Sequence, residues 1–308
     1  MYELMRLARG GVLLTVRAYE AGWSRGRLRG RLRREGWQPI WRGAWAAPGK
    51  EVDWRERARI IQLLRPDLVC SHVTAAALHR IERLNSSEIP EVLEFTTHRP
   101  GPAGISTRSG IRVHSTPFLT EADNSVRAGL RVTTPPRTVA DLIRAAASRE
   151  EAVVAADSAL ARRTVQGVRR EPLVRQEQLA DELIPRRPGT VRARAWLRLT
   201  DPAAGSPAET IARLHMHDAG LHPESQPPLR TRSGRTLHPD FLFREAGLAV
   251  EIEGYAFHGT RRAHERDIAR FNALTDCQEV RRVLRFTATD VFRHPERVIG
   301  TIRRALED

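Results

Sequence analysis

Three acidic residues lie within two short apolar runs between Leu237 and Gly254. Asp240 precedes the run Phe-Leu-Phe, and Glu251 and Glu253 belong to the run Leu-Ala-Val-Glu-Ile-Glu. Burying carboxylates in an apolar element is unfavourable unless another group compensates their charge. A divalent cation is the usual compensation for clustered carboxylates. The segment therefore predicts a Mg²⁺ or Mn²⁺ site, and such an ion can activate water against a phosphodiester.

The positions of these acids predict how a β-hairpin would arrange them. With a turn at Glu245 and Ala246, Asp240 faces Glu251, and directly opposed side chains lie roughly 5 Å apart. A three-residue turn would instead make them diagonal neighbours. Alternation along the second strand places Glu251 and Glu253 on one face and their apolar neighbours on the other. The alternative is a surface hairpin whose acids pair with arginines. The two expected strands are Leu237–Arg244 and Leu248–Gly254.

The same residues resemble a known nuclease signature. Asp240 followed by Glu251-Ile-Glu253 is similar to the bipartite PD-(D/E)XK motif, with Glu253 where lysine is usual. The continuation Glu253-Gly-Tyr-Ala-Phe-His258-Gly resembles the Vsr-type branch, which includes a large actinobacterial family with a Glu-x-Asp-Gly-x-x-x-His motif. The resemblance implies that Asp240 and Glu251 are metal ligands and that Glu253 is a ligand or positions water. It also implies that His258 is an acid or base in catalysis.

Glu209 has two interpretations. Ser206-Pro-Ala-Glu209 matches a capping box that opens a helix, which needs no chemistry. In nucleases of the type that this chain resembles, an acid on the first helix often completes the metal shell, so we also include Glu209 among the catalytic candidates. Gln226 precedes an expected strand and receives no catalytic role.

The C-terminal part predicts a restriction-endonuclease-like α/β domain over residues 200–308. The expected order is helix, three strands, helix, strand, helix. A helix over Arg262–Ala273 and a strand over Arg281–Phe286 follow the acidic hairpin, and a last helix is expected over Val291–Leu306. The α/β fold assignment depends partly on the Vsr-type resemblance.

The first 50 residues contain a helix with an unusual density of arginine. Ser24 is expected to cap a helix over Arg25–Glu35, and Gly43 lies at an expected turn between two strands within Trp37–Ala47. This order predicts a winged helix-turn-helix whose third helix enters a DNA groove. A solvated charged face is the alternative. The DNA-contacting candidates are Ser24, Arg25, Arg27, Arg29, Arg31, Arg34 and, on the wing, Arg42.

The N-terminal half also resembles AbiEi-type antitoxins, in which a winged helix binds DNA and represses transcription. The similar segments include Ala-Gly-Trp-Ser-Arg, His72-Val-Thr-Ala-Ala-Ala and Thr133-Thr-Pro-Pro-Arg137-Thr-Val-Ala-Asp141. Residues 51–165 mix expected helices and strands, and the resemblance implies an AbiEi-like α+β domain there. The polar, arginine-rich residues that follow, interrupted by prolines, predict a helical linker over residues 166–199. Arg137 and Asp141 are four residues apart, which favours a structural salt bridge.

Composition limits the possible partners. The net charge of +14 and pI of about 11.2 favour a polyanion such as nucleic acid, although Lys50 is the only lysine and part of the arginine excess fits codon bias. Two distant cysteines, Cys70 and Cys277, suit a reducing compartment. Without an 18-residue apolar run, we expect a cytoplasmic protein that does not enter membranes.

Two functional hypotheses remain open at this point. The first is a magnesium-dependent endonuclease acting on double-stranded DNA, in repair or defence. The second is a non-catalytic, antitoxin-like transcriptional regulator, with a toxin or a second copy as its partner. Charge alone leaves RNA open as the substrate.

Overall fold

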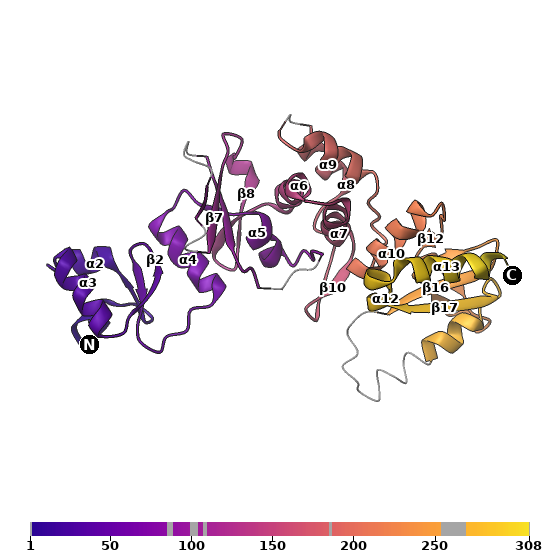
Figure 1. The fold of residues 1–308 in the computed structure, drawn as a ribbon, viewed down its shortest axis with the longest axis horizontal. Coiled ribbons are helices and arrows are strands. Elements are labelled where there is room, and N and C mark those ends of the chain that lie inside the picture. Colours follow the sequence, from indigo (N-terminus) through magenta and orange to yellow (C-terminus); the bar gives the residue numbers. More distant parts are fainter. Residues whose placement is uncertain are drawn as a thin grey trace. The chain divides into compact units, whose positions relative to one another are not determined.

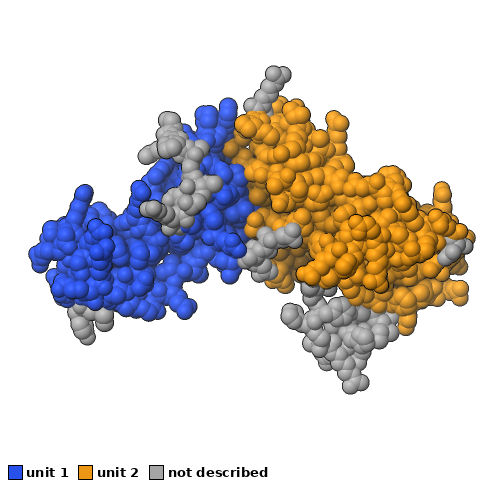
Figure 2. Space-filling model, in the orientation of Figure 1, with its two compact units in different colours: residues 1–79, 87–134 blue, residues 80–86, 135–308 orange. Residues whose placement is uncertain are grey.

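The structure is a computed structural model of the 308-residue chain and describes residues 2–84, 89–98, 104–106, 110–184, 187–253 and 269–307. These residues form a mixed α/β protein that divides into two compact units (Figure 2). Unit 1 comprises Met1–His79 and Ser87–Thr134, and unit 2 comprises Arg80–Ser86 and Pro135–Asp308. No helix among the described residues is both long and apolar enough to cross a membrane.

Unit 1 begins with helices packed beside a small antiparallel sheet of order β1-β3-β2. Ser24 accepts a hydrogen bond from the backbone N–H of Arg27 and so caps α3, as predicted. Gly43 has φ of +89° in the turn between β2 and β3, a conformation that favours glycine. Strand β1 was not predicted. The elements are α1 (Tyr2–Leu7), β1 (Val12–Leu14), α2 (Thr15–Glu20), α3 (Arg25–Arg34), β2 (Gln38–Trp41) and β3 (Ala44–Ala46).

The rest of unit 1 is built on a six-stranded mixed sheet of order β6-β7-β5-β4-β9-β8 (Figure 1). Strands β5 and β7 are parallel, and Phe95 of β5 lies in a buried apolar core with Leu68, Leu78 and Val132. The elements are α4 (Trp54–Leu64), β4 (Val69–Cys70), α5 (His72–His79), β5 (Leu93–Thr97), β6 (Gly104–Ser106), β7 (Ile111–Ser115), η1 (Glu121–Asp123), β8 (Asn124–Arg127) and β9 (Leu130–Thr133).

Unit 2 begins with helices around α7, which is almost wholly buried because its inward positions are alanine and valine. Arg137 donates to Asp141 at 2.8 Å within α6, so the predicted i, i+4 salt bridge is confirmed. Helices α8 and α9 pack on α6, and α9 also packs on α7. The segment 166–199, predicted as a linker, therefore belongs to unit 2. The elements are α6 (Pro135–Ala145), α7 (Arg149–Leu160), β10 (Arg163–Val165), β11 (Val168–Arg170), α8 (Gln176–Glu182) and α9 (Thr190–Leu197).

The C-terminal part of unit 2 contains a four-stranded sheet of order β12-β15-β16-β17, in which only β16 and β17 are parallel. Helices α10, α12 and α13 cover one face of the sheet (Figure 1), and Leu274, in the helical residues 269–275, packs on the other face. The elements are α10 (Pro207–Asp218), β12 (Glu224–Ser225), β13 (Leu229–Arg230), β14 (Thr236–Leu237), β15 (Phe241–Phe243), β16 (Leu248–Glu253), β17 (Arg282–Thr287), α12 (Ala288–Arg293) and α13 (Pro295–Glu307).

Two predicted elements of this part were wrong in extent. The expected strand Leu237–Arg244 is two strands, because β14 pairs with β13 and only β15 pairs with β16. Pro239 lies between them, and proline cannot donate to a strand ladder. The expected last helix begins earlier and is broken at His294, because the following Pro295 cannot continue the hydrogen-bonding of α12.

Candidate functional site

The register of the acidic hairpin agrees with the prediction. Phe241 pairs with Val250, which places Asp240 opposite Glu251 at the start of β15. The backbone N–H of Asp240 donates to Oε1 of Glu251 at 3.2 Å, and the backbone N–H of Ile252 donates to Oδ2 of Asp240 at 2.7 Å. Each acid is thus tied to the strand that carries the other.

The two faces of β16 explain why the acids lie together. Val250 and Ile252 are buried in the core with α10, α12 and α13, whereas Ala249 is buried in the core on the opposite face. Glu251 follows the alternation of Ala249 and has a side chain only 13% exposed. The carboxylates therefore lie on the face covered by residues 269–275, as the predicted alternation implied.

Glu209 joins this pair through Gln226. The side-chain amide of Gln226 donates to Oε2 of Glu209 at 3.0 Å and lies 3.5 Å from Oδ1 of Asp240. The backbone N–H of Gln226 donates to the Asp240 carbonyl at 3.0 Å. One amide thus connects an acid of α10 with the acid that precedes β15.

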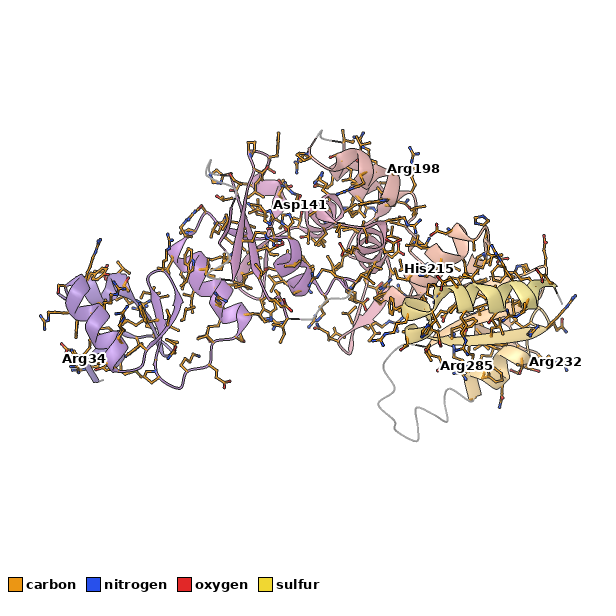
Figure 3. All side chains as sticks on the ribbon, viewed as in Figure 1. Arg34, Asp141, Arg198, His215, Arg232 and Arg285 are labelled. Carbon is orange, nitrogen blue, oxygen red and sulfur yellow. The ribbon has the colours of Figure 1, made fainter. Side chains whose placement is uncertain are left out.

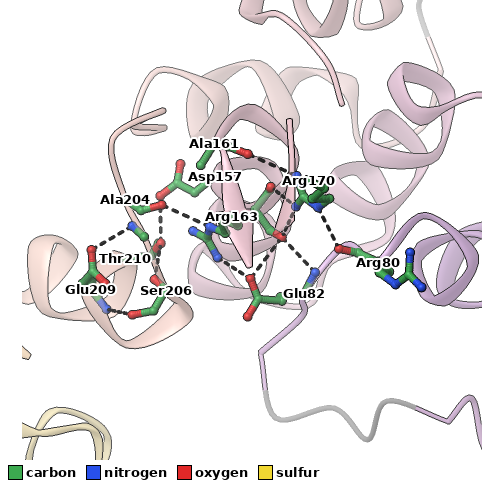
Figure 4. Close-up of polar contacts among 12 residues, drawn as sticks. Arg80, Glu82, Asp157, Ala161, Arg163, Arg170, Ala204, Ser206, Glu209 and Thr210 are labelled. Carbon is green, nitrogen blue, oxygen red and sulfur yellow. Dashed lines mark hydrogen bonds and ion pairs between the residues drawn. The ribbon is translucent and has the colours of Figure 1, made fainter. Parts of the chain in front are cut away.

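The cap of α10 differs from the predicted capping box. Ser206 accepts from the N–H of Glu209 at 3.2 Å, as expected, but the Glu209 carboxylate accepts from Gly205 at 2.7 Å (Figure 4). A Cβ on Gly205 would lie 3.0 Å from Oε1 of Glu209 and 3.3 Å from Nε2 of Gln226. The absence of a side chain at position 205 therefore leaves room for both groups.

Gln226 has φ of +48°, in the left-handed region that non-glycine residues rarely adopt. Such a conformation is unfavourable by about 1–3 kcal/mol and persists where surrounding contacts enforce it. The backbone bond to Asp240 and the contact of its carbonyl with Nδ1 of His238 at 3.1 Å are such contacts. Backbone strain is therefore located at the residue that bridges two acids.

The electrostatics indicate carboxylates that repel one another. Burial, together with the neighbouring charges of Glu209 and Glu251, raises the pKa of Asp240 to about 8. Burial also raises the pKa of Glu209, against the hydrogen bond from Gly205. Without an added cation, the site therefore retains a proton near neutral pH.

Arg270 is the cation that the protein itself supplies to this cluster. Its Nε donates to Oε2 of Glu251 at 3.0 Å, and its Nη2 lies 3.2 Å from Oε1. Nη2 also donates to the carbonyl of His238 at 2.7 Å. Asp240 accepts no hydrogen bond from an arginine among the described contacts, and its carboxylate instead accepts from the N–H of Ile252.

Glu253, another predicted site residue, lies apart from these contacts. Glu253 forms an ion pair with Arg285 of β17 at 2.6 Å, and Arg285 is labelled in Figure 3. His258 lies outside the described residues. The structure therefore brings together Asp240, Glu251 and Glu209, whereas Glu253 is paired with a strand neighbour.

In unit 1, the arginines of α3 lie mostly on its solvent side. Leu28 and Leu32 are buried against Leu4 and Leu13, which leaves the arginine-bearing faces outward. Arg31 is the partly buried member and forms an ion pair with Glu35. The exposed candidates are Ser24, Arg25, Arg27, Arg29, Arg34 (labelled in Figure 3) and Arg42.

Gln226 and Arg270 are site residues to which the sequence reasoning gave no role. An isolated glutamine before an expected strand carries no spacing signal. Arg270 is one of 51 basic residues, so its type did not distinguish it. The position of Arg270 in the chain is equally uninformative, because its contact with Glu251 spans 19 residues of sequence.

No protein-family model matches the chain. Two curated relatives from Mycobacterium tuberculosis, the uncharacterized protein MT2308 of strain CDC 1551 / Oshkosh and the uncharacterized protein Rv2248 of strain ATCC 25618 / H37Rv, are each 28% identical over 270 residues. These matches cover 87% of this chain and 92% of each relative. The crystal structure of the RV2827C protein from Mycobacterium tuberculosis is similar at a TM-score of 0.43 and 21% identity, covering 73% of this chain and 82% of that one.

Proposed function

We propose that the chain is a metal-dependent endonuclease of double-stranded DNA, with a Vsr-like PD-(D/E)XK site in its C-terminal part. The observation that carries the proposal is the convergence of Asp240, Glu251 and Glu209 on the polar end of an otherwise apolar sheet. Three acids that share a proton near neutral pH form a site that a divalent ion would neutralise. The proposed ion is Mg²⁺, or Mn²⁺ in its place.

Asp240 and Glu251 would hold the ion, because their oxygens are the hard ligands that Mg²⁺ prefers. The bound ion would supply positive charge at the scissile phosphate and lower the pKa of a coordinated water. Gln226, the strained residue before β13, would position the Asp240 carboxylate through its side-chain amide. Glu209 of α10 would hold that amide in place. His258 is retained in the proposal as the acid or base, on the resemblance alone.

Delivery to DNA is assigned to the first 50 residues, proposed as a winged helix-turn-helix. The order helix, strand, helix, helix, strand, strand supports this assignment. Exposed arginines on α3 would contact phosphates, and those contacts make binding depend steeply on salt. Ser24 and Arg25, at the start of α3, would be nearest to base edges.

The second candidate is a non-catalytic, antitoxin-like DNA-binding regulator. One observation favours it: Glu251 and Glu253 are both already neutralised by arginines, Arg270 and Arg285. A site balanced in this way can keep its fold without a metal ion. A toxin partner or a homodimer would then be the target of regulation.

Cleavage assays on the full-length protein distinguish the two candidates. Supercoiled, nicked, mismatched and single-stranded DNA would be incubated with Mg²⁺, Mn²⁺ or EDTA. We expect metal-dependent cleavage by the wild type and by Glu245→Gln, which removes an exposed acid from the turn of the same hairpin. Asp240→Asn and Glu251→Gln should reduce the rate by at least about 100-fold, because each removes a ligand charge.

The wild type and Asp240→Asn behaving alike on every substrate would refute the nuclease. Retention of DNA binding in that case, measured by anisotropy in EDTA, would support the regulator. If Arg27→Ala in α3 left the affinity and its salt dependence unchanged, the delivery role of α3 would be wrong.

A further inference from the structure

Three side chains that commonly ligate metals converge in unit 1. His72 is the first residue of α5, Glu94 lies on β5 and His114 lies on β7. Each offers one ligand atom, and these atoms all lie within 4.8 Å of one another. His72 belongs to the segment His72-Val-Thr-Ala-Ala-Ala, for which the proposed nuclease activity provides no role.

The parallel pairing of β5 and β7 brings Glu94 and His114 to one face of the sheet. Glu94 is opposite Arg112, and His114 is two residues further along β7, on the same face. The alternate residue Phe95 points into the apolar core. Helix α5 begins over this polar face, because the N–H of Ser71 donates to the Glu94 carbonyl at 3.0 Å.

The Glu94 carboxylate contacts three partners. It is only 3% exposed. Its Oε1 pairs with Arg112, while its Oε2 accepts from the N–H of Val73 at 3.3 Å and lies 3.9 Å from Nε2 of His114. Burial would raise the pKa of Glu94, but His114 and the charge of His72 outweigh burial and lower it.

The two histidines lie beside this carboxylate. Their rings stack with centroids 3.8 Å apart and an interplanar angle of 16°. Nε2 of His114 is buried and has no hydrogen-bond partner, although such nitrogens are normally paired. His72 has φ of +47°, in the left-handed region that non-glycine residues rarely adopt.

We propose that His72, Glu94 and His114 bind one late first-row divalent transition-metal ion, of which Zn²⁺ is the best match. Two imidazoles and one carboxylate form a donor set typical of Zn²⁺ with a fourth position open to water or another ligand. Ligands of a tetrahedral zinc lie about 3.4 Å apart, so binding would draw the three ligand atoms together and rotate the two stacked rings out of their near-parallel arrangement.

Two of the proposed ligands already have polar partners that would orient them around such an ion. The Ser71 hydroxyl lies 3.0 Å from Nδ1 of His72, and Arg112 binds the Glu94 oxygen that faces away from His114. Contacts of this kind orient ligating imidazoles and carboxylates. Side-chain exposures of 32% for His114 and 38% for Arg112 give the ion a route from solvent. The ion would join α5 to β5 and β7.

The test uses the full chain carrying Asp240→Asn, which removes a ligand from the C-terminal acidic site. After removal of bound metals, Zn²⁺ binding is measured by calorimetry and Co²⁺ binding by its visible absorption. We expect one equivalent of Zn²⁺ and a Co²⁺ spectrum of tetrahedral type. His114→Ala and His72→Ala should each weaken binding by more than tenfold, and Ser71→Ala by about tenfold. His98→Ala, an exposed histidine next to β5, is the matched control and should bind as the parent does.

Two results would overturn the proposal. One is the absence of Zn²⁺ and Co²⁺ binding in the parent protein. The other is unchanged affinity in His114→Ala or, if circular dichroism shows that this variant does not fold, in His114→Gln. Because every protein in the test already lacks Asp240, the outcome is independent of the proposed nuclease activity.

Discussion

Replacing Asp240 with asparagine should stabilise unit 2 when no divalent metal is present. The ordinary pKa of an aspartate is about 4, and burial together with Glu209 and Glu251 raises that of Asp240 to about 8. Between these values the folded state binds a proton that the unfolded state has released. The stability of the wild type therefore falls as the pH rises from about 4 to about 8.

The size of the effect follows from the same pKa values. Each tenfold change in a dissociation constant corresponds to about 1.4 kcal/mol, so the limit at pH 8 is about 5 kcal/mol. Glu209 and Glu251 share the proton, and Asp240 is only partly buried, so we expect a gain of about 1–2 kcal/mol for Asp240→Asn. Asparagine can still accept the hydrogen bond from Ile252 through its side-chain oxygen, so the hairpin keeps its register.

Urea unfolding in EDTA, followed at about pH 4 and about pH 8, measures this difference. The variant and the wild type should coincide at the lower pH, and the variant should be more stable at the higher pH. Adding Mg²⁺ at the higher pH should stabilise the wild type more than the variant. Glu245→Gln, in the exposed turn of the hairpin, should show neither effect. A less stable Asp240→Asn at about pH 8, or a difference independent of pH, would refute the electrostatic reasoning.

Three further changes test buried pairing, backbone conformation and helix capping in the two units. Asp157→Ala should destabilise unit 2 by about 3–5 kcal/mol in urea unfolding, because Arg213 would lose a buried ion pair of 2.9 Å; a loss below about 1 kcal/mol would contradict this. Gly247→Ala should destabilise by about 1–3 kcal/mol, since φ is +61° and the new Cβ would lie 2.8 Å from Cγ of Arg281; an unchanged unfolding midpoint would count against it. Ser24→Ala should lower the stability of unit 1 by about 1 kcal/mol through loss of the α3 cap, measured by thermal unfolding, with Ser24→Asp restoring it.

The relation between the acidic site and Arg270 bears on both candidate functions. An arginine that binds both oxygens of Glu251 stabilises the carboxylate without a metal, so the site can fold before a metal ion binds. A nuclease would require Arg270 to yield one oxygen, whereas a regulator would keep the pair intact. The stability of Arg270→Gln, measured with and without a divalent metal ion, would therefore test whether Arg270 and the ion compete for Glu251. Cleavage assays alone do not test this competition.

Local sequence determined several features of this protein. The apolar alternation of residues 248–253 was enough to predict the strand and the face that carries its acids, because side-chain direction in a strand has a period of two. The pairing of Asp240 with Glu251 followed from the expected turn at Glu245 and Ala246. Ser24 and Ser206 marked the starts of α3 and α10, because capping depends on a few neighbouring residues.

Only the tertiary structure revealed the groups that complete the site. Gln226 reaches Glu209 and Asp240 through side-chain bonds, and Arg270 reaches Glu251 from the helical residues 269–275 that cover the same face of the hairpin. The cluster of His72, Glu94 and His114 likewise depends on the parallel pairing of β5 with β7. Such contacts join residues far apart in the chain, so no local spacing indicates them. Long-range packing determines which polar groups meet, whereas the sequence pattern determines the elements that carry them.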